Sequence, residues 1–451
     1  MEAFEIALIS VFAMLALIYL GLHIATTLAL LSFLGVWFIK GNVTIAVNLL
    51  WVSAYDTVNN YVFAAIPLFV LMGFLVAAAG MGRDAYDIGQ ILLRRVKGGL
   101  GMATVVANAI FAAITGVSVA SASVFSKLSV PEMLRHGYTA RFAVGTVAGS
   151  SVLGMLIPPS VLFIVYALIT EQSVGDMFIA GILPGLLLTA AYCTQIFIMA
   201  HWFPHTVMTR RDTGVQRAAE QGDAAGGTGD LLRKAGPIAL LVTLVLGGLY
   251  GGVFTPVEAG AAGAFLGLIF ALVRRKLTWA RFWDVLLETG SVTATLLFLI
   301  VAASMYSRML GLSGLPSELA VLFEGSGLGF HGLLVIYVII VIILGTIIDS
   351  VSIMLIMVPL FIASLKSFQI DLVWFGVVTV IATEVGLLTP PFGLAVFVVH
   401  STLRRPDITL RDIFIGSAPF AIAQGILFVA FVIVTVWAAR AFRRGTAAAH
   451  A

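Results

Sequence analysis

The sequence predicts an all-helical protein that crosses a membrane many times, and its composition is the first observation behind this prediction. Hydrophobic residues make up 61% of the 451 residues and charged residues only 10%. Soluble domains average roughly 45–50% apolar and about 25% charged residues. Crossing a bilayer core takes about 20 helical residues, so the chain has room for about a dozen such helices.

The second observation is an interrupted pattern that occurs twice. Each copy has a polar Gly/Ser break inside an apolar run, then a proline, then a Gly-to-Pro-Pro break inside another apolar run. The copies lie at 114–123, 131 and 154–159, and at 344–352, 359 and 386–391. Helices at membrane depth break only where the freed backbone is buried in protein or lines a cavity. Paired breaks in two halves of a chain therefore indicate the binding site of a transporter.

The first half of the chain contains the first copy. Its expected elements are membrane helices at 4–20, 21–39 and 62–80, an interfacial stretch at 44–60, an amphipathic surface helix at 83–97, a re-entrant hairpin formed by 98–115 and 119–134, and a broken helix at 140–172. The stretch 44–60 mixes aromatic and polar residues, which suits the membrane interface. The first apolar run is not expected to be a signal peptide, because Glu2 and Glu5 stand where a basic segment belongs.

The second half of the chain contains a polar, glycine-rich segment that is expected to be flexible, followed by the second copy of the pattern. Its expected elements are a span at 177–203, the linker at 204–235, spans at 236–254, 256–273 and 286–310, a surface segment to 329, a re-entrant hairpin at 331–363, a broken helix at 371–403 and a last span at 413–438. Proline removes a backbone donor, so Pro390 and Pro391 are expected to end a half-helix, as Pro158 and Pro159 do in the first copy.

Lysine and arginine set the orientation, because cytoplasmic loops carry an excess of basic residues. Nineteen of the 25 basic residues fall in five loops that we place in the cytoplasm: 81–97, 127–141, 204–235, 274–281 and 404–411. The first hairpin then enters from the cytoplasm and the second from the opposite face. The two halves are inverted relative to each other, as in many secondary transporters. The N-terminus and the basic C-terminus both fall outside.

The first hairpin tip offers oxygen atoms to a cation. Ser118, Ser121 and Ser123 carry hydroxyls, and the break frees backbone carbonyls, which hard cations such as Na⁺ take as ligands. The ends of the half-helices also present N–H groups to an anion. The alternative is that these small residues serve only close helix packing.

The second tip carries Asp349, an acidic residue at membrane depth. A charge there costs roughly 2.5–3.5 kcal/mol on insertion scales. Asp349 is therefore expected to be a cation ligand, a cap for the following helix, or both. Glu384 is expected to face a cytoplasm-side cavity or to pair with a partner residue. Glu258, after Thr255 and Pro256, is expected to stabilise a helix N-terminus.

Motifs of enzymatic chemistry are not found in the sequence. It has no Walker A motif, which argues against a built-in ATPase, and neither His-Glu-x-x-His nor Gly-x-Ser-x-Gly. His136, His201 and His205 lie near expected helix ends without the spacing of metal ligands. The single cysteine, Cys193, excludes a disulfide framework and a Cys-based metal site. An enzyme is therefore not expected.

Seven short motifs, taken in order, resemble those of the large membrane subunit of the tripartite ATP-independent periplasmic (TRAP) transporters. They are AIPLF at 65–69, GGLGM at 98–102, ITGVSVAS at 114–121, GMLIPPS at 154–160, TPVEA at 255–259, IDSVS at 348–352 and LTPPFG at 388–393. They cover nearly the whole chain. The order of seven matches is more specific than any single one.

The resemblance implies a Na⁺-driven importer of organic acids, such as a sialic acid or a dicarboxylate, in the bacterial inner membrane. It implies an elevator mechanism, in which hairpins and broken helices carry substrate through a fixed scaffold. The implied partners are a four-helix small membrane subunit, a periplasmic substrate-binding protein, the carboxylate substrate and the lipid bilayer. A nucleic acid and an organic cofactor are not expected. The small subunit is expected as a separate chain, because the sequence begins directly at the large subunit's first helix.

The resemblance also assigns binding residues and domains. The first Na⁺ site comprises Gly116, Ser118, Ser121, Gly154, Ile157 and Pro158, and the second comprises Gly345, Thr346, Asp349, Gly386 and Thr389. The substrate is assigned to Ser123, Ser160, Ser350 and Pro391. The expected divisions are N-terminal scaffold helices and surface arm helix at 1–97, transport unit 1 at 98–172, scaffold helices at 173–330, transport unit 2 at 331–404, and a C-terminal helix and tail at 405–451.

An ion or solute channel is the alternative function. Channels usually build a pore by symmetric assembly around a filter. An inverted repeat within one chain favours alternating access instead. The separate binding protein is expected to select which acid is carried, so the sequence of this chain does not name it.

Overall fold

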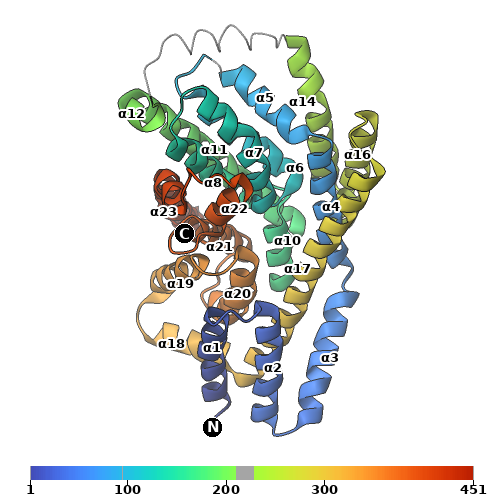
Figure 1. The fold of residues 1–451 in the computed structure, drawn as a ribbon. Coiled ribbons are helices and arrows are strands. Elements are labelled where there is room, and N and C mark those ends of the chain that lie inside the picture. The colour runs from blue at the N-terminus through green and yellow to red at the C-terminus, as the bar shows by residue number, and fades with distance from the viewer. Residues whose placement is uncertain (1, 94, 210–227, 450–451) are drawn as a thin grey trace.

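The computed structural model describes residues 2–93, 95–209 and 228–449. Within these ranges the structure is helical (Figure 1), apart from an isolated β-bridge between Tyr138 and Met208. Eight of the described helices are long and apolar enough to cross a membrane, and six shorter apolar helices accompany them. The predicted class, an all-helical polytopic membrane protein, is confirmed.

The N-terminal helices pack along a long helix, α17, with α1, α2 and α3 beside one of its ends and α4 farther along it (Figure 1). They are α1 (Ala3–Tyr19), α2 (Ile24–Lys40), α3 (Val43–Asn59), the 3₁₀ turn η1 (Tyr61–Ala64) and α4 (Ala65–Ala78). The interfacial stretch is a regular helix, because the Asn42 side chain accepts a hydrogen bond from Thr44 N at 2.8 Å and caps it. Trp51 and Tyr55 on α3 are exposed, as the interfacial interpretation requires.

The amphipathic segment forms α5 (Met81–Leu93), which ends four residues earlier than predicted. Arg94 lies outside the described residues. Tyr86 and Ile88 are buried, and a Cβ added to Gly89 would lie 2.7 Å from the carbonyl oxygen of Ala103 on α6. Much of the apolar face of α5 is therefore covered by protein.

The first unit has the predicted order of a helical hairpin and a broken helix. The hairpin is α6 (Gly99–Thr115) and α7 (Ser118–Arg135), and the broken helix is α8 (Ala140–Ser151) with the short α9 (Leu153–Leu156), then α10 (Val161–Thr170). The second unit repeats this order as α19 (Gly329–Gly345), α20 (Ser350–Ser367), α21 (Leu372–Leu387) and α22 (Leu394–Leu403). The prolines predicted within the hairpins lie inside α7 and α20.

The helices between the two units depart from prediction mainly in length. They are α11 (Val174–Trp202), α12 (Pro204–Val207), α14 (Thr228–Val242) continued through η2 (Thr243–Gly247) and α15 (Gly248–Tyr250), α16 (Pro256–Val273), α17 (Trp279–Ser313) and α18 (Leu315–Gly325). The span predicted at 286–310 is one helix of 35 residues. It begins early because the Thr278 hydroxyl accepts a hydrogen bond from Arg281 N at 3.3 Å.

The predicted linker 204–235 extends past the start of the next helix in the structure. Its central part, 210–227, lies outside the described residues, but α14 already begins at Thr228. Lys234 Nζ lies 2.8 Å from Asp230 Oδ2 and 3.0 Å from Asp87 Oδ2. The contact with Asp87 holds the start of α14 against α5, and it joins residues that are far apart in the sequence.

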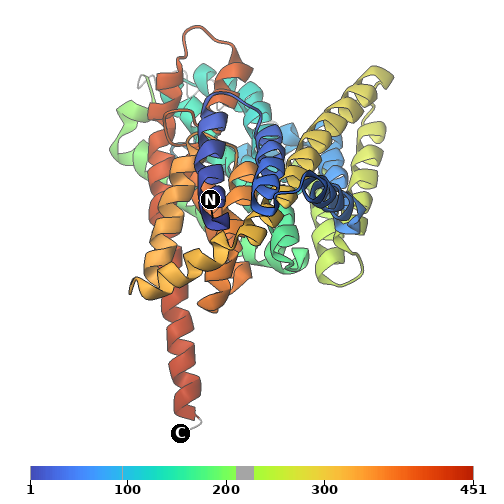
Figure 2. The same ribbon diagram turned by 90° about the horizontal axis from the view of Figure 1, so that it is seen from below.

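The last helix, α23 (Leu410–Ala449), is continuous and projects beyond the other helices at its C-terminal end (Figure 2). Its first part packs tightly on α8. A Cβ added to Gly145 on α8 would overlap the backbone of Gly416, and one added to Gly149 would lie 2.5 Å from the Phe420 side chain. Small residues of this kind let helix backbones approach each other where lipid gives no hydrophobic drive.

Candidate functional site

The first hairpin tip touches the Pro-Pro loop of the helix that follows it. Gly116 follows the last residue of α6 and caps it with φ +65°. The Gly116 carbonyl accepts a hydrogen bond from Val161 N at 3.3 Å. A Cβ on Gly116 would overlap the Pro159 carbonyl oxygen, and one on Gly154 would lie 2.8 Å from the Ser118 Cα. The backbones of tip and loop are thus in direct contact.

The second tip touches its own loop in a comparable way. The Thr346 carbonyl accepts hydrogen bonds from Phe392 N at 3.2 Å and Gly393 N at 3.4 Å. A Cβ on Gly386 would lie 2.6 Å from the Gly345 Cα. The structure therefore brings Gly154 beside Ser118 in the first unit and Gly345 beside Gly386 in the second. The assignment of the two ion sites stays a prediction.

A second contact recurs in both units, farther from the tips. In the first unit Asn108 Nδ2 donates to Ser150 Oγ at 2.7 Å across 42 positions, joining α6 to α8. In the second, the Tyr337 and Thr379 hydroxyls lie 3.0 Å apart, also across 42 positions, and join α19 to α21. All four residues are buried. The two units are built alike in their contacts as well as in their order.

The serine hydroxyls near the first tip, two assigned to the first Na⁺ site and two to the substrate, differ in burial and in hydrogen bonding. The Ser118, Ser121 and Ser160 side chains are buried, whereas Ser123 is half-buried. Ser160 Oγ donates to the Met155 carbonyl at 2.5 Å and caps α10. Ser121 Oγ is buried and has no hydrogen-bond partner, so this hydroxyl has unused capacity to bind a ligand.

In the second site the polar groups are bonded locally. Asp349 caps α20 by accepting a hydrogen bond from Ser352 N at 3.0 Å, and it also accepts one from Ser352 Oγ. Thr346 Oγ1 and Thr389 Oγ1 each donate at 2.8 Å to a carbonyl of the helix that precedes them. The capping prediction for Asp349 is confirmed. Its role as a cation ligand stays a prediction.

The predicted substrate residues are divided between the interior and the surface. Ser160 and Ser350 are buried, Ser123 is half-buried, and Pro391 is exposed together with Pro390 and Phe392. No direct contact joins these four residues among the described hydrogen bonds. Their assignment to the substrate stays a prediction.

Glu384 was not assigned to either site from the sequence, yet its carboxyl group is part of the second unit's core. Its side chain is 1% exposed, and Ser350 Oγ donates to Glu384 Oε1 at 2.9 Å. The expectation of a partner residue was right, and the partner is a hydroxyl beside the tip. The only signal in the sequence was a lone carboxylate within an apolar run.

Glu258 stabilises the start of α16, as predicted. Thr255 N donates to Glu258 Oε2 at 2.8 Å, and Glu258 N donates back to Thr255 Oγ1 at 3.3 Å. These reciprocal bonds form a capping box. Its role is structural, and it does not contribute to either predicted ion site.

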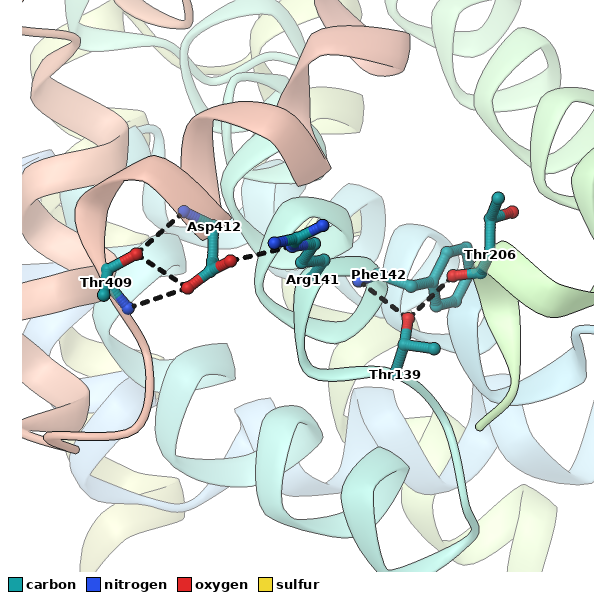
Figure 3. Close-up of polar contacts among 6 residues, drawn as sticks. All are labelled: Thr139, Arg141, Phe142, Thr206, Thr409 and Asp412. Carbon is teal, nitrogen blue, oxygen red and sulfur yellow. Dashed lines mark hydrogen bonds and ion pairs between the residues drawn. The ribbon is translucent and has the colours of Figure 1, made fainter. Parts of the chain in front are cut away.

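Polar contacts also fix the first unit to its surroundings at the start of α8 (Figure 3). Arg141 Nε donates to Asp412 Oδ1 at 2.7 Å, at the beginning of α23. Thr139 Oγ1 donates to the Thr206 carbonyl at 2.7 Å, and Thr139 N donates to the Val207 carbonyl at 2.9 Å. The broken helix of the first unit is therefore tied to α23 and to the chain that follows α11.

The tip–loop contact predicts a specific cost for Gly116→Ala. Left-handed backbone costs an L-residue about 1–2 kcal/mol, and the overlap with Pro159 should add about 1–3 kcal/mol. Gly137→Ala is the matched control, because Gly137 has φ +79° but no atom within 4 Å of an added Cβ. We expect a clearly lower unfolding temperature in detergent for Gly116→Ala than for Gly137→Ala. Equal unfolding temperatures would contradict a packed tip–loop contact.

Comparisons with known proteins agree with this architecture. Residues 11–438 match the model of the family described as "Tripartite ATP-independent periplasmic transporter, DctM component". The chain is 33% identical to the C4-dicarboxylate TRAP transporter large permease protein DctM of Pseudomonas aeruginosa, covering 86% of this chain and 87% of that protein. It is 27% identical to the sialic acid TRAP transporter large permease protein SiaM of Vibrio cholerae, covering 95% and 96%.

A solved structure supports the fold. The YdaH transporter of Alcanivorax borkumensis superposes with a TM-score of 0.60 at 16% identity, covering 88% of this chain and 89% of that one. The sequence relatives above are transporter permeases and not enzymes, which is consistent with the expectation from the motifs. The family match spans nearly the whole chain, so this protein belongs to the DctM components, the large membrane subunits of tripartite ATP-independent periplasmic transporters.

Proposed function

We propose that this chain is the Na⁺-coupled permease of a secondary transporter that imports an organic acid. The observation that carries the proposal is the contact between each hairpin tip and its Pro-Pro loop, at Gly116 and at Thr346. Each contact gathers carbonyl and hydroxyl oxygens at a break in two helices, and such oxygens are what Na⁺ requires. The two Na⁺ sites and the substrate residues are those assigned from the sequence.

The substrate class follows from the relatives and from the chemistry of helix ends. A C4-dicarboxylate and a sialic acid, for which the two relatives are named, are both carboxylates. Half-helix N-termini favour anions through their free N–H groups, and α7, α10, α20 and α22 all begin at the breaks. We propose that a periplasmic binding protein delivers the acid and that a small membrane subunit completes the complex in the inner membrane.

Packing supports an elevator in which one body moves against another. Gly181 and Gly185 of α11 lie against the first unit, since an added Cβ would lie 2.9 Å from the Leu156 carbonyl oxygen and 2.6 Å from Ile157 Cγ1 respectively. Helix α23 packs on α8 with similar closeness at Gly145. We therefore propose that α11 and α23 move with both units, although the division at 173–330 placed α11 in the scaffold.

The proposed scaffold is held together by other contacts. Ser10 Oγ lies 3.0 Å from the Tyr306 hydroxyl, and Arg308 donates to Asp56 Oδ2 at 2.7 Å. These bonds join α1 and α3 to α17. A cavity of about 300 Å³ lies at the boundary of this group with α10 and α20, with Asn60 and Ser304 on one side and Pro359 on the other. A polar gap of this kind suits a boundary along which two bodies slide.

A channel is the less favoured alternative. In the proposed inverted arrangement, two similar units within one chain present two half-sites to each other, and neither unit forms a ring around an open filter. Saturable uptake that depends on a Na⁺ gradient would distinguish a transporter from a channel.

Reconstitution tests the proposed function directly. We expect the purified chain alone in liposomes to give negligible Na⁺-driven uptake of labelled succinate or N-acetylneuraminic acid, used as probes of the two carboxylate classes. Adding the small subunit and the binding protein loaded with its acid should give uptake that saturates. Robust uptake by the chain alone would contradict the tripartite proposal, and current without saturation would favour a channel.

The inverted topology predicts opposite accessibility for two exposed lysine or arginine positions. In a Cys193→Ser background, Arg275→Cys should react with a membrane-impermeant maleimide only after the cells are opened, because 274–281 is placed in the cytoplasm. Lys366→Cys should react in intact cells. Both side chains are exposed, so burial does not limit the reaction. Labelling of both positions from the same side would rule out the inverted arrangement.

The second Na⁺ site predicts that charge removal at Asp349 weakens coupling. Asparagine keeps the N-cap hydrogen bond, so Asp349→Asn tests the charge with little effect on α20. We expect the Na⁺ concentration for half-maximal uptake to rise about tenfold, equivalent to about 1.4 kcal/mol. Asp371→Asn is the matched control, because Asp371 also caps a helix, α21, by accepting from Trp374 N at 2.7 Å.

The first site can be tested in the same assay with Ser121→Ala. Ser126→Ala is its control, because Ser126 lies on the same helix and its hydroxyl is equally buried and without a partner. A Na⁺ dependence that is unchanged in both Asp349→Asn and Ser121→Ala would mean that the tips serve helix packing and not ion binding.

A further inference from the structure

We propose that the cavity between the two proposed bodies is an entry site for the acid on the outer side of the membrane, and that Arg308 binds the carboxylate there. The inference rests on the proposed transport function and deepens it. It adds a carboxylate-binding residue in the proposed scaffold, which neither the sequence pattern nor the family match assigns.

One face of α17 supplies the cavity with hydrogen-bond donors. Ser304, Ser307 and Arg308 line the cavity, and their spacing of three and four residues places them on the same side of the helix. Within the described part of the chain, neither serine hydroxyl has a hydrogen-bond partner. Asn60 also lines the cavity. Its Oδ1 accepts from Val62 N at 3.0 Å, which leaves the amide nitrogen to donate elsewhere.

The Arg308 guanidinium is only partly engaged by protein. Its Nη2 donates to Asp56 Oδ2 at 2.7 Å, and no second hydrogen bond runs parallel to this one. A guanidinium favours a carboxylate that is held by two parallel N–H groups. The side chains of Arg308 and Asp56 are 39% and 51% exposed, and ion pairs with such exposure contribute little to stability. An incoming carboxylate can therefore replace Asp56 at Arg308.

The lining of the cavity suits an anion better than a cation. Among its lining residues in the described structure, Arg308 is the one basic group and Asp56 the one acidic group. The remaining polar groups include free hydroxyl and amide donors, whereas Asp56 is already bonded to Arg308. The volume of about 300 Å³ lies at the lower end of the range for small-molecule sites, so a small carboxylic acid fits.

The cavity lies close to the residues assigned to the substrate. Leu355 lines it from α20 and follows Ser350 by five residues, which is about 8 Å along a helix. Leu168 lines it from α10 and follows Ser160 by eight residues, about 12 Å along a helix. The same two helices therefore lead from the cavity to a hairpin tip and to a Pro-Pro loop.

The proposed topology places the cavity on the outer side of these breaks. Arg308 lies near the end of α17 that is opposite the loop 274–281, which is placed in the cytoplasm. Helix α20 runs from the second tip past the cavity to Lys366, which is placed outside. An acid released by the binding protein thus meets Arg308 before it reaches the breaks.

Protection of a cysteine tests the site without a transport assay. In a Cys193→Ser background, Ser304→Cys places a thiol in the cavity, and the full chain in nanodiscs is treated with methyl methanethiosulfonate. We expect succinate to slow the reaction of this thiol and the neutral analogue succinamide to leave its rate unchanged. Absence of protection by both succinate and N-acetylneuraminic acid would overturn the proposal, as would equal protection by succinamide.

Removal of the guanidinium should weaken this protection. Arg308→Gln should raise the half-protecting concentration of succinate about tenfold, because the variant loses a charged donor. Arg281→Gln is the matched control, because it removes an exposed guanidinium from the other end of α17 and should leave the protection unchanged. Equal protection in Arg308→Gln and Arg281→Gln would contradict carboxylate binding at Arg308.

Asp56→Asn separates a carboxylate site from an ion pair that only holds α3 on α17. Removing the competing carboxylate frees Arg308, so the half-protecting concentration should fall about threefold. A purely structural ion pair predicts changes in the same direction for Arg308→Gln and Asp56→Asn, and that result would overturn the proposal. If Arg308→Gln does not fold, Asp56→Asn still decides, because a half-protecting concentration that does not fall overturns the proposal.

Uptake by the complete complex distinguishes this inference from the transport proposal. With saturating loaded binding protein, Arg308→Gln should slow the initial uptake of the acid. It should leave the Na⁺ concentration for half-maximal uptake unchanged, because Arg308 belongs to neither proposed Na⁺ site. If the complex shows no Na⁺-driven uptake, the proposed function fails, while protection of Ser304→Cys still decides the carboxylate site. Normal uptake without any protection would overturn this inference alone.

Discussion

The need to satisfy backbone hydrogen bonds at membrane depth is the constraint on which this structure depends. A break in a helix frees carbonyl and N–H groups, and lipid offers them no partner. Here one freed carbonyl at each hairpin break accepts a hydrogen bond from the break in the next helix, Gly116 O from Val161 N and Thr346 O from Phe392 N. Neither break in a pair would be stable without the other. This mutual dependence explains why both occur together in each half of the chain.

Close approach of helix backbones extends this constraint to the neighbouring helices. Gly145 against Gly416 and Gly345 against Gly386 leave no room for a single added carbon. Contacts of this kind give dispersion energy in a bilayer, where the hydrophobic effect does not drive helix association. They make α23, α11 and both units a tightly packed body, whereas the boundary with α3 and α17 includes a polar cavity. The proposed boundary between a moving body and a scaffold at α3 and α17 is based on this difference in packing.

Most of the fold was predictable, because the features that determine it are local in sequence. The two hairpins, both Pro-Pro breaks and the capping box at Glu258 follow from residue types within a few positions of one another. The features that were not predicted depend on tertiary contacts. The start of α14 depends on Lys234 meeting Asp87 of another helix, and the burial of α5 depends on Gly89 facing Ala103. The partner of Glu384 was hidden for the same reason, since Ser350 lies 34 positions away. The periodicity of a single helix does not identify the residues of other helices that contact it.

The two units match in backbone contacts but differ in charge, and this difference bears on coupling. The recurring buried contact is an amide with a hydroxyl in the first unit, Asn108 with Ser150, and two hydroxyls in the second, Tyr337 with Thr379. Only the second unit also places acidic residues, Asp349 and Glu384, at its tip and in its core. A neutral site can bind Na⁺ through oxygen dipoles alone, whereas buried carboxylates strongly disfavour an empty, ionised state. In the elevator mechanism proposed above, we therefore expect the second unit to resist moving across the membrane until a cation neutralises it. The first unit has no acidic residue at its tip or in its core that must be neutralised. We therefore propose that ion binding in the second unit determines whether the units can move.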